Sequence, residues 1–277
     1  IDEMTSEQSK IFNVKNKNIV VTGTGGLLGR EYAIMLSKMG ANVILLDINE
    51  KNNQKLEYFL KKSFPTNCKA YTADITNEKQ LFEISKIILR KYKKIHGLVN
   101  NAAYTTKGAK DESAKSYIEF ENFPSKIWEK SIAVNLTGVF NCCKIFGKFM
   151  AKQKSGVIVN VSSIYGLVGA DQRIYGNSKL NSPVSGAATK GAILNFTRYL
   201  ASYWHDKNIR VNTLTLGGVQ DNSYQSSQFV KNYSQKTMLG RMAKKHEFNG
   251  ALLFLLSDAS SYMTGSNLII DGGWTAW

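Results

Sequence analysis

The chain of 277 residues has only three prolines, three cysteines and three histidines. Two cysteines, Cys142 and Cys143, are adjacent, and neither the cysteines nor the histidines have the spacing of metal ligands. We therefore expect no metal site and no disulfide framework, which suits a reducing, cytoplasmic location. No low-complexity linker divides the chain, and its 43% of hydrophobic residues suffice for one large core. We expect a single domain over residues 1–277.

Long apolar runs are also missing. No run approaches the roughly 20 residues of a membrane-spanning helix. Residues 1–10 are polar and partly acidic, which is unlike a signal peptide. We interpret residues 1–16 as an N-terminal extension and expect no membrane partner.

Acidic residues are scarce, with 21 Asp and Glu against 36 Lys and Arg, so the formal net charge is +15. Such an excess can indicate nucleic-acid binding. The lysines are spread along the chain, however, and the densest cluster, residues 90–94, has the pattern of an exposed helix end. We expect a lysine-rich surface and no nucleic-acid partner, with a small anionic substrate as the functional alternative.

A strand, a glycine-rich turn and a helix follow one another near the N-terminus. Residues 18–22 have the pattern of a buried strand, and residues 30–38 that of a helix. Between them, Gly23 permits a sharp turn, Gly26 a close approach to a pyrophosphate, and Gly29 tight helix packing. The N–H groups at the helix start would bind the phosphates. This pattern predicts a dinucleotide site that includes Gly23, Gly26, Leu27, Leu28 and Gly29.

Asp47 ends a second apolar run, 24 residues after Gly23. A carboxylate at such a strand end accepts hydrogen bonds from the adenosine ribose hydroxyls and repels a 2′-phosphate. This favours NAD as the cofactor. Asp47 as a helix cap is the alternative interpretation, and Arg30 keeps NADP as second choice.

Further strands and helices alternate along the chain, which predicts an α/β fold with a doubly wound, Rossmann-type parallel sheet and helices on both faces. Ligands of such sheets bind beyond the carboxyl ends of the strands, where Gly23, Asp47, Asp74 and Asn101 would gather. We expect helices over residues 50–63 and 78–92 and a strand over residues 69–75. Residues 96–103 should form a fourth strand that runs into a turn of small residues.

The order of these motifs resembles that of the short-chain dehydrogenase/reductase family. The resemblance covers residues 19–273 and implies an NAD(P)-dependent oxidoreductase that moves hydride between nicotinamide and a carbon bearing a hydroxyl or ketone. It also implies a homodimer or homotetramer. The motifs that carry it are residues 22–29, Asp74, residues 100–102, residues 134–138, residues 160–163, residues 262–265 and residues 271–273.

The resemblance implies further cofactor contacts. Adenine would lie near Asp74 and Ile75, Asn101 and Ala102 would follow the fourth strand, and the nicotinamide would lie beside a turn that contains Gly218 and Val219. Leu216 stands where this turn normally has a proline, which makes the turn less rigid without removing its backbone donors.

The family's chemistry uses a tyrosine and a lysine four residues apart on one helix face, together with a serine and an asparagine. Asn135 and Ser163 match the last two, and the asparagine's role is to hold a water linked to the lysine. Lys190 lies along the apolar face of a predicted helix, where an unpaired lysine would be unfavourable. We therefore predict Lys190 as the catalytic-type lysine, which also contacts the cofactor.

The tyrosine does not follow this pattern, because Gly186 occupies the position four before Lys190. Tyr175 and Lys179 have the right spacing, but Gly176 and Pro183 make a continuous helix unfavourable. Three explanations stay open. Gly186 replaces a natural tyrosine by a deliberate change; or Tyr175 folds back from a segment longer than usual and supplies the phenol; or the protein binds nucleotide without turnover.

The rest of the chain bears on substrate and assembly. Residues 220–245 contain a polar, aromatic-dotted stretch that is either a flap over the substrate or an ordinary surface loop. Trp274 and Trp277 are large aromatics at the chain end, more easily buried against a neighbouring subunit than exposed. Several turns are similar to those of a subgroup linked to bacterial surface-sugar biosynthesis; a 3-oxoacyl thioester or a simple alcohol is the alternative substrate.

Overall fold

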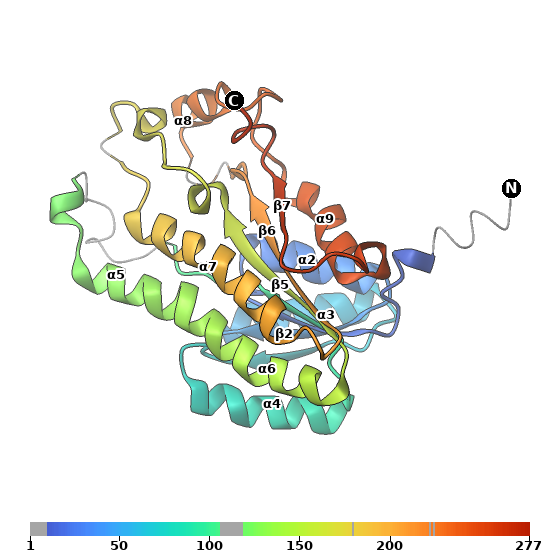
Figure 1. The fold of residues 1–277 in the computed structure, drawn as a ribbon. Helices are drawn as coiled ribbons and strands as arrows, with labels where there is room; N and C mark the ends of the chain where they lie inside the picture. Colours follow the sequence, from blue (N-terminus) through green and yellow to red (C-terminus); the bar gives the residue numbers. More distant parts are fainter. Residues whose placement is uncertain (1–9, 106–118, 179, 222, 224) are drawn as a thin grey trace, which may run out of the picture.

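The computed structural model describes residues 10–105, 119–178, 180–221, 223 and 225–277. Most of the proposed N-terminal extension, residues 1–9, lies outside these ranges, as does Lys179. The centre is a sheet of seven parallel strands in the order β3-β2-β1-β4-β5-β6-β7 (Figure 1). The strands are β1 (Asn18–Thr22), β2 (Asn42–Asp47), β3 (Lys69–Thr72), β4 (Gly97–Asn100), β5 (Gly156–Ser163), β6 (Ile209–Leu216) and β7 (Asn267–Ile270).

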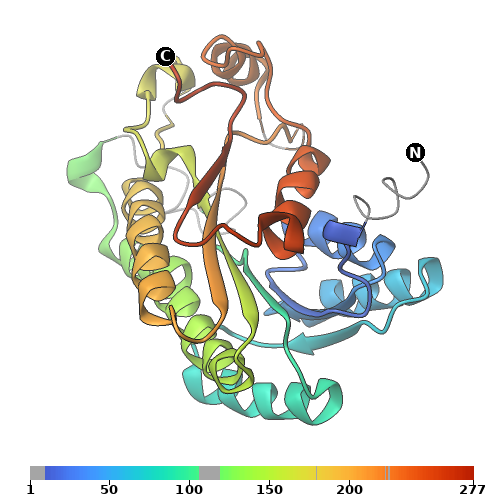
Figure 2. The same cartoon turned by 45° about the vertical axis from the view of Figure 1, so that its right-hand side comes forward.

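Helices cover both faces of this sheet, which confirms the doubly wound Rossmann-type fold (Figure 2). One face carries α4 (Glu78–Tyr92), α6 (Val139–Gln153) and α7 (Val184–Tyr203), with α5 (Ser125–Ile132) leading into α6. The opposite face carries α2 (Leu27–Lys38), α3 (Glu50–Ser63) and α9 (Asn249–Leu256).

Alternating strand residues form the two cores. Val20 packs with the α4, α6 and α7 side, and its neighbour Val21 packs with the α2, α3 and α9 side. Both are completely buried, since strands of such a parallel sheet are covered on both faces. No helix within the described ranges has the length and apolar character needed to cross a bilayer.

Two predicted boundaries were wrong by a few residues. The third strand ends at Thr72 rather than residue 75, because the Asp74 carboxylate accepts hydrogen bonds from the N–H and hydroxyl of Thr76 and turns the chain toward α4. The first helix begins at Leu27 instead of residue 30, whereas the fourth strand spans residues 97–100 and leaves the sheet at Asn101, within the stretch predicted as strand and turn. Asp74, Ile75, Asn101 and Ala102 therefore lie in the segments that follow the strands.

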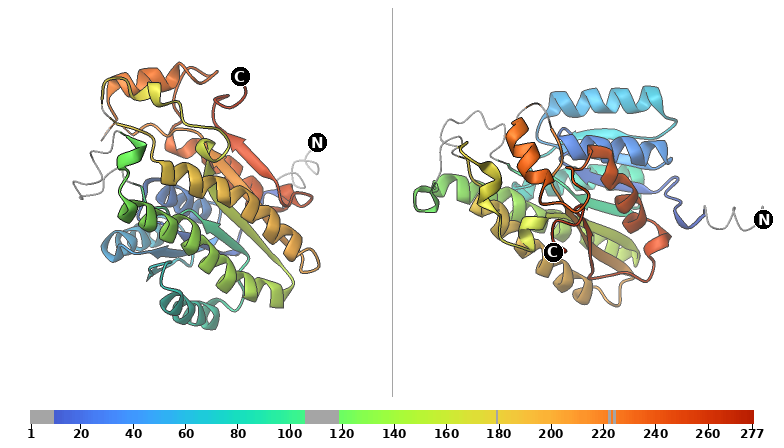
Figure 3. Two further views of the ribbon diagram at one scale, coloured as in Figure 1. Left: turned by 60° about the vertical axis from the view of Figure 1, so that its left-hand side comes forward. Right: turned by 90° about the horizontal axis from the view of Figure 1, so that it is seen from above.

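The chain end folds onto its own subunit. Helix α8 (Ser227–Ser234) and the C-terminus lie at the same end of the molecule (Figure 3). Trp274 is 8% exposed and stacks on Tyr233, with ring centroids 4.3 Å apart. A neighbouring subunit is therefore not needed to bury Trp274, contrary to the expectation from sequence. Trp277 is 73% exposed, and its indole N–H donates to the Lys236 carbonyl.

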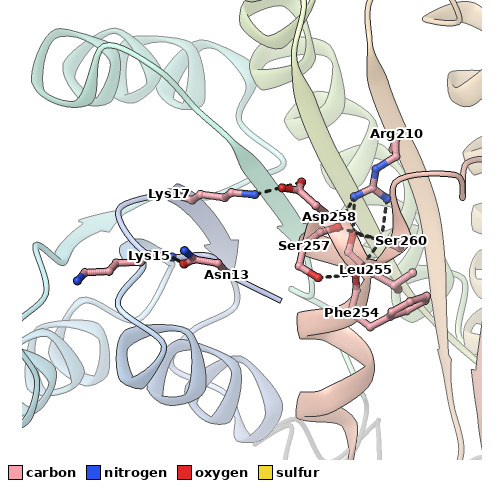
Figure 4. A network of polar contacts seen from close by, with 9 residues as sticks. All are labelled: Asn13, Lys15, Lys17, Arg210, Phe254, Leu255, Ser257, Asp258 and Ser260. Atoms are coloured by element: carbon pink, nitrogen blue, oxygen red, sulfur yellow. Dashed lines mark hydrogen bonds and ion pairs between the residues drawn. The ribbon is translucent and has the colours of Figure 1, made fainter. Parts of the chain in front are cut away.

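A polar network fastens the opposite end of the sheet, around Arg210 at the start of β6 (Figure 4). The Arg210 guanidinium donates to the carbonyls of Leu255 and Ser257 and to the Ser260 hydroxyl. These carbonyls lie in the last turn of α9 and just after it, where carbonyl groups lack partners within the helix; the Ser260 hydroxyl also donates to both. Lys17 pairs with Asp258 at 3.4 Å in the same region. The network holds α9 to the sheet, far from the glycine turn.

Candidate functional site

A cavity of about 690 Å³ opens at the carboxyl ends of the strands, where a ligand of this fold is expected. It brings together every residue that the sequence predicts for the site except Gly29. The predicted residues that line it are Gly23, Gly26, Leu27, Leu28, Asp47, Asp74, Ile75, Asn101, Ala102, Asn135, Ser163, Tyr175, Lys190, Gly218 and Val219.

The glycine turn has the geometry that a pyrophosphate requires. Gly23 has a φ of +72°, a conformation that side chains rarely adopt. A Cβ at Gly29 would lie 2.1 Å from the Gly23 carbonyl oxygen, so Gly29 packs the helix against the turn rather than lining the cavity. Gly26 caps α2 without a side-chain hydrogen bond, and no acidic residue occupies the first turn. The helix start is thus suited to phosphate oxygens.

Asp47 lies at the end of β2 and faces the same cavity. Its carboxylate accepts hydrogen bonds from the N–H groups of Gly25 and Asn49, both at 2.7 Å. Asn49, not Asp47, caps α3, because the Asn49 side chain accepts the Asn52 N–H. The helix-cap interpretation of Asp47 is therefore wrong. Arg30 lies over the Phe59 ring, 5.6 Å from its centroid.

Asn101 and Ala102 connect the fourth strand to the glycine turn. The Asn101 side chain donates to the Thr22 and Gly23 carbonyls, and the backbone N–H groups of Asn101 and Ala102 donate to the Thr22 hydroxyl. These bonds hold the two strand ends at a fixed separation. Ile75 forms part of the adjacent wall, and its carbonyl accepts a hydrogen bond from the buried side chain of Asn141.

Asn135 lies in a π-helical turn, residues 133–138, between α5 and α6. Such turns are frequent at functional sites. Its side-chain oxygen accepts the Tyr104 N–H at 2.7 Å, and its side-chain nitrogen donates to the Tyr104 carbonyl at 3.2 Å. Both amide atoms thus hold the segment after β4. The predicted role of Asn135 in holding a water stays a prediction.

Ser163, at the end of β5, and Lys190, on α7, line the same cavity, and hydrogen bonds of Lys190 join α7 to β5. The Lys190 ammonium donates to the Val161 carbonyl at 2.8 Å, and the Ser162 hydroxyl donates to the Lys190 carbonyl at 2.9 Å. Burial lowers the pKa of Lys190 to about 8. Within the described part of the chain, no carboxylate forms an ion pair with Lys190. Ser163 accepts the Tyr165 N–H, and its own hydroxyl proton can be donated to a ligand.

Gly186 lies on α7 one turn before Lys190, and both line the cavity. A Cβ at Gly186 would meet no heavy atom within 4 Å, so the position where the family carries its tyrosine opens into free space. No backbone strain or crowding requires a glycine there. Helix α7 thus supplies the lysine but no phenol one turn before it.

Tyr175 comes from a separate short 3₁₀-helix, residues 172–175, and is 8% exposed. Gly176 follows with a φ of +53°, and the helix ends at Tyr175. Tyr175 belongs to the same apolar cluster as Ile164, the neighbour of Ser163, and it lines the cavity. The segment before α7 therefore folds back and brings a phenol to the wall that carries Ser163.

Tyr165 is a second phenol near Ser163, but its ring packs edge-on against Trp274, with centroids 6.4 Å apart. Burial and the nearby Tyr175 raise the pKa of Tyr165 well above its ordinary value. A phenol with a raised pKa is a poorer acid near neutral pH. Tyr165 is thus a packing residue.

The turn after β6 is held by residues far along the chain. Gly217 donates to the Ile270 carbonyl, Gly218 to the Tyr233 hydroxyl, and Ala243 to the Gly218 carbonyl. Among the described residues, none accepts a hydrogen bond from the Val219 N–H, which is left for a ligand. Sequence reasoning missed Tyr233, because it is 15 residues from Gly218 and no local pattern links them.

The described residues that line the cavity give the anionic-substrate prediction little support. Lys190 is their only cation, whereas Asp47, Asp74 and Asp221 are acidic. The substrate side consists largely of aromatic and aliphatic side chains, among them Tyr165, Ile164, Tyr175, Phe229, Tyr233 and Met242. The surplus positive charge therefore lies on the outer surface, as the dispersed lysines predicted.

Comparison with known proteins agrees with this geometry. The sequence model of a family described as enoyl-(acyl carrier protein) reductase matches residues 26–275. A 3-oxoacyl-[acyl-carrier-protein] reductase of Thermotoga maritima is 31% identical, covering 94% of this chain and 98% of the relative. The post-translational flagellin modification protein A of Campylobacter coli is 33% identical, covering 94% and 99%. A short-chain dehydrogenase of Leptospira borgpetersenii with bound NAD⁺ is 34% identical, with a TM-score of 0.79 and coverage of 95% and 94%.

The chain therefore belongs to the short-chain dehydrogenase/reductase family of NAD(P)-dependent oxidoreductases. The glycine turn, whose backbone leaves no space for side chains at Gly23 and Gly29, fits the dinucleotide cofactor of this family. The alternative of a nucleotide-binding protein without turnover is not favoured.

Proposed function

We propose that the protein is an NAD-dependent oxidoreductase that interconverts an alcohol and a ketone, with Ser163, Tyr175 and Lys190 as its catalytic residues. The observation that carries the proposal is their meeting in one cavity, beside an intact dinucleotide turn. The nicotinamide, when bound, supplies or accepts the hydride.

In the direction of reduction, the Ser163 hydroxyl donates a hydrogen bond to the substrate oxygen. The Tyr175 hydroxyl gives its proton to that oxygen as the carbonyl carbon receives hydride. The Lys190 ammonium favours the tyrosinate that remains, since a positive charge lowers the pKa of a phenol. Oxidation reverses these transfers. Asn135 supports the site by holding Tyr104 and, we infer, a water linked to Lys190.

NAD is the preferred cofactor in this proposal. The Asp47 carboxylate faces the cavity and would accept hydrogen bonds from the ribose hydroxyls, whereas a 2′-phosphate would be repelled. Asp74 and Ile75 would lie beside the adenine. Val219 would donate its N–H to the nicotinamide side of the cofactor, and Gly218 shapes the turn.

The proposal also includes a single domain over residues 1–277, a substrate flap within residues 220–245 and assembly into a homo-oligomer. Within residues 220–245, Gln225, Phe229, Tyr233 and Met242 line the cavity, which supports a substrate flap. The family supports a homo-oligomer, and a cytoplasmic location stays a prediction. A surface sugar is the second candidate substrate, supported by a relative named for post-translational flagellin modification.

The test is turnover of NAD⁺ or NADH, followed by absorbance, with a panel of secondary alcohols, polyols and ketones. We expect turnover with at least one member of each redox pair, and a loss of about 10²-fold or more in Ser163→Ala. Cofactor binding without turnover of any member would favour the binding protein instead. An equal rate in Ser163→Ala would exclude Ser163 from the catalytic site.

A further inference from the structure

A second, smaller cavity adjoins the site at the start of α7. It has a volume of about 260 Å³ and shares Ser182, Pro183 and Ala187 with the main cavity. Because three residues line both spaces, the cavities are neighbours, and a sufficiently long ligand would extend from one into the other. The other described residues that line the second cavity are Glu119, Phe120, Phe123, Ala170, Gln172, Asn181 and Val184.

Gly186 leaves room at this junction. It lines the main cavity, and the next residue, Ala187, lines both. Since a Cβ at Gly186 would meet nothing within 4 Å, no side chain of the described residues fills the space above it. The same glycine that removes the family's phenol therefore widens the site on the side of the second cavity.

The lining of the second cavity is chiefly apolar. Phe120, whose side chain is 71% exposed, and Phe123 provide aromatic surface. The polar groups make hydrogen bonds within the protein: the Gln172 side chain accepts the Ser182 N–H at 2.8 Å, and the Glu119 carboxylate accepts from Asn122 at 2.8 Å. The Glu119 charge also disfavours an anionic group there. An apolar group would gain most by entering, since it buries apolar surface.

Ion pairs and hydrogen bonds fix the segment that forms one wall. The Asp171 carboxylate pairs with Arg173 at 2.7 Å and with Lys236 at 2.8 Å, and these partners hold its pKa well below its usual range. Asn232 of α8 donates to the Ile174 carbonyl at 3.1 Å. The wall is thus built before any ligand arrives, which reduces the entropy lost on binding.

We propose that the second cavity is a substrate subsite that takes an aliphatic or aromatic substituent of the reacting alcohol or ketone. This inference rests on the proposed function and names its substrate class: a neutral secondary alcohol or ketone whose apolar chain passes over Gly186. Each buried methylene is worth about 0.8 kcal/mol, so kcat/KM rises about three- to fourfold for each methylene that enters the subsite.

The test compares kcat/KM for 2-alkanones of increasing length, from 2-butanone to 2-decanone, with NADH. In the wild-type protein, we expect the ratio of kcat/KM for 2-decanone to that for 2-butanone to exceed 10. Ala187→Phe places a ring at the junction, and Phe123→Ala removes apolar surface, so both lower this ratio. Phe82→Ala, a change on the outer surface of α4, is the matched control and leaves it at the wild-type value.

Equal kcat/KM for all chain lengths, an unchanged ratio in Ala187→Phe, or turnover confined to polyols would overturn the subsite while the oxidoreductase function stands. Absence of any turnover would overturn the proposed function first. The subsite is then tested by saturation-transfer NMR of 2-decanone with the protein. A signal that weakens in Ala187→Phe supports it, and an equal signal in both proteins overturns it.

Discussion

The glycine turn and the segment from Ser163 to Lys190 lie at the same edge of one sheet, yet they follow the family pattern to different degrees. The turn keeps its glycines because backbone geometry leaves no alternative: a Cβ at Gly29 would overlap the Gly23 carbonyl. The catalytic segment needs only a phenol at the right place, and a phenol can come from another part of the chain. Cofactor binding is thus constrained by shape, and catalysis by the presence of a functional group.

The largest effect on turnover is expected at Lys190, which the proposal assigns to both cofactor binding and catalysis. Replacement by methionine, Lys190→Met, keeps the length of the side chain and removes its charge, so kcat should fall on the order of 10³-fold. Steady-state turnover measures this effect. A fall of less than tenfold would show that the ammonium does not take part.

Although Lys190→Met should lower turnover, it should raise the free energy of unfolding. The folded pKa of Lys190, about 8, is below the ordinary 10.5, so burying the charge destabilises the protein by up to about 3 kcal/mol below pH 8. Lys190→Met should therefore be more stable than wild type in urea unfolding at pH 7. This difference should shrink as the pH rises from 8 toward 10.5; a constant difference would contradict the buried charge. Wild-type reduction should also slow as the pH rises through 8.

A matched pair of glycine substitutions separates the two regions. Gly29→Ala overlaps the Gly23 carbonyl, so we expect about 1–3 kcal/mol of destabilisation and at least tenfold weaker binding of NADH. Gly186→Ala meets open space on a helix and should stabilise the protein by about 0.5–1 kcal/mol. Urea unfolding and NADH fluorescence measure both. Similar changes in stability and in NADH binding in the two variants would contradict the distinction between the glycine turn and the catalytic segment.

Asp47 tests the cofactor preference on the glycine-turn side. Asp47→Ser removes the charge that repels a 2′-phosphate, so the ratio of kcat/KM for NAD to that for NADP should fall about 10- to 100-fold. Asn49→Ser, which keeps a capping side chain on α3, is the control. An unchanged ratio in Asp47→Ser would show that another residue selects the cofactor.

The smallest effect is expected when the Tyr233 hydroxyl is removed. Tyr233→Phe removes the acceptor of the Gly218 N–H while the ring still packs on Trp274. A typical hydrogen bond is worth about 0.5–1.5 kcal/mol, so the KM for NADH should rise about three- to tenfold. Tyr199→Phe, on the exposed face of α7, should leave this KM unchanged. An unchanged KM in Tyr233→Phe would mean that the turn holds its shape without this bond.

The comparison also explains what sequence could predict. The alternation of strands and helices, the glycine turn and the place of Asp47 follow from local patterns, because each depends on periodicity, on backbone geometry or on a strand end. The fold and the gathering of Ser163 and Lys190 were therefore predictable. The hydrogen bond from Gly218 to Tyr233 and the packing of Trp274 within its own chain depend on contacts between residues that are distant in the sequence. No periodicity records such contacts, so only the structure reveals them.

The most direct test of the account is the turnover of Tyr175→Phe beside that of the double variant Tyr175→Phe/Gly186→Tyr. If Tyr175 supplies the phenol that Gly186 cannot, the single variant should lose about 10²- to 10⁴-fold in kcat. The double variant should regain part of that loss, because a phenol returns one turn before Lys190. Full turnover in Tyr175→Phe would contradict the account and place the proton donor elsewhere.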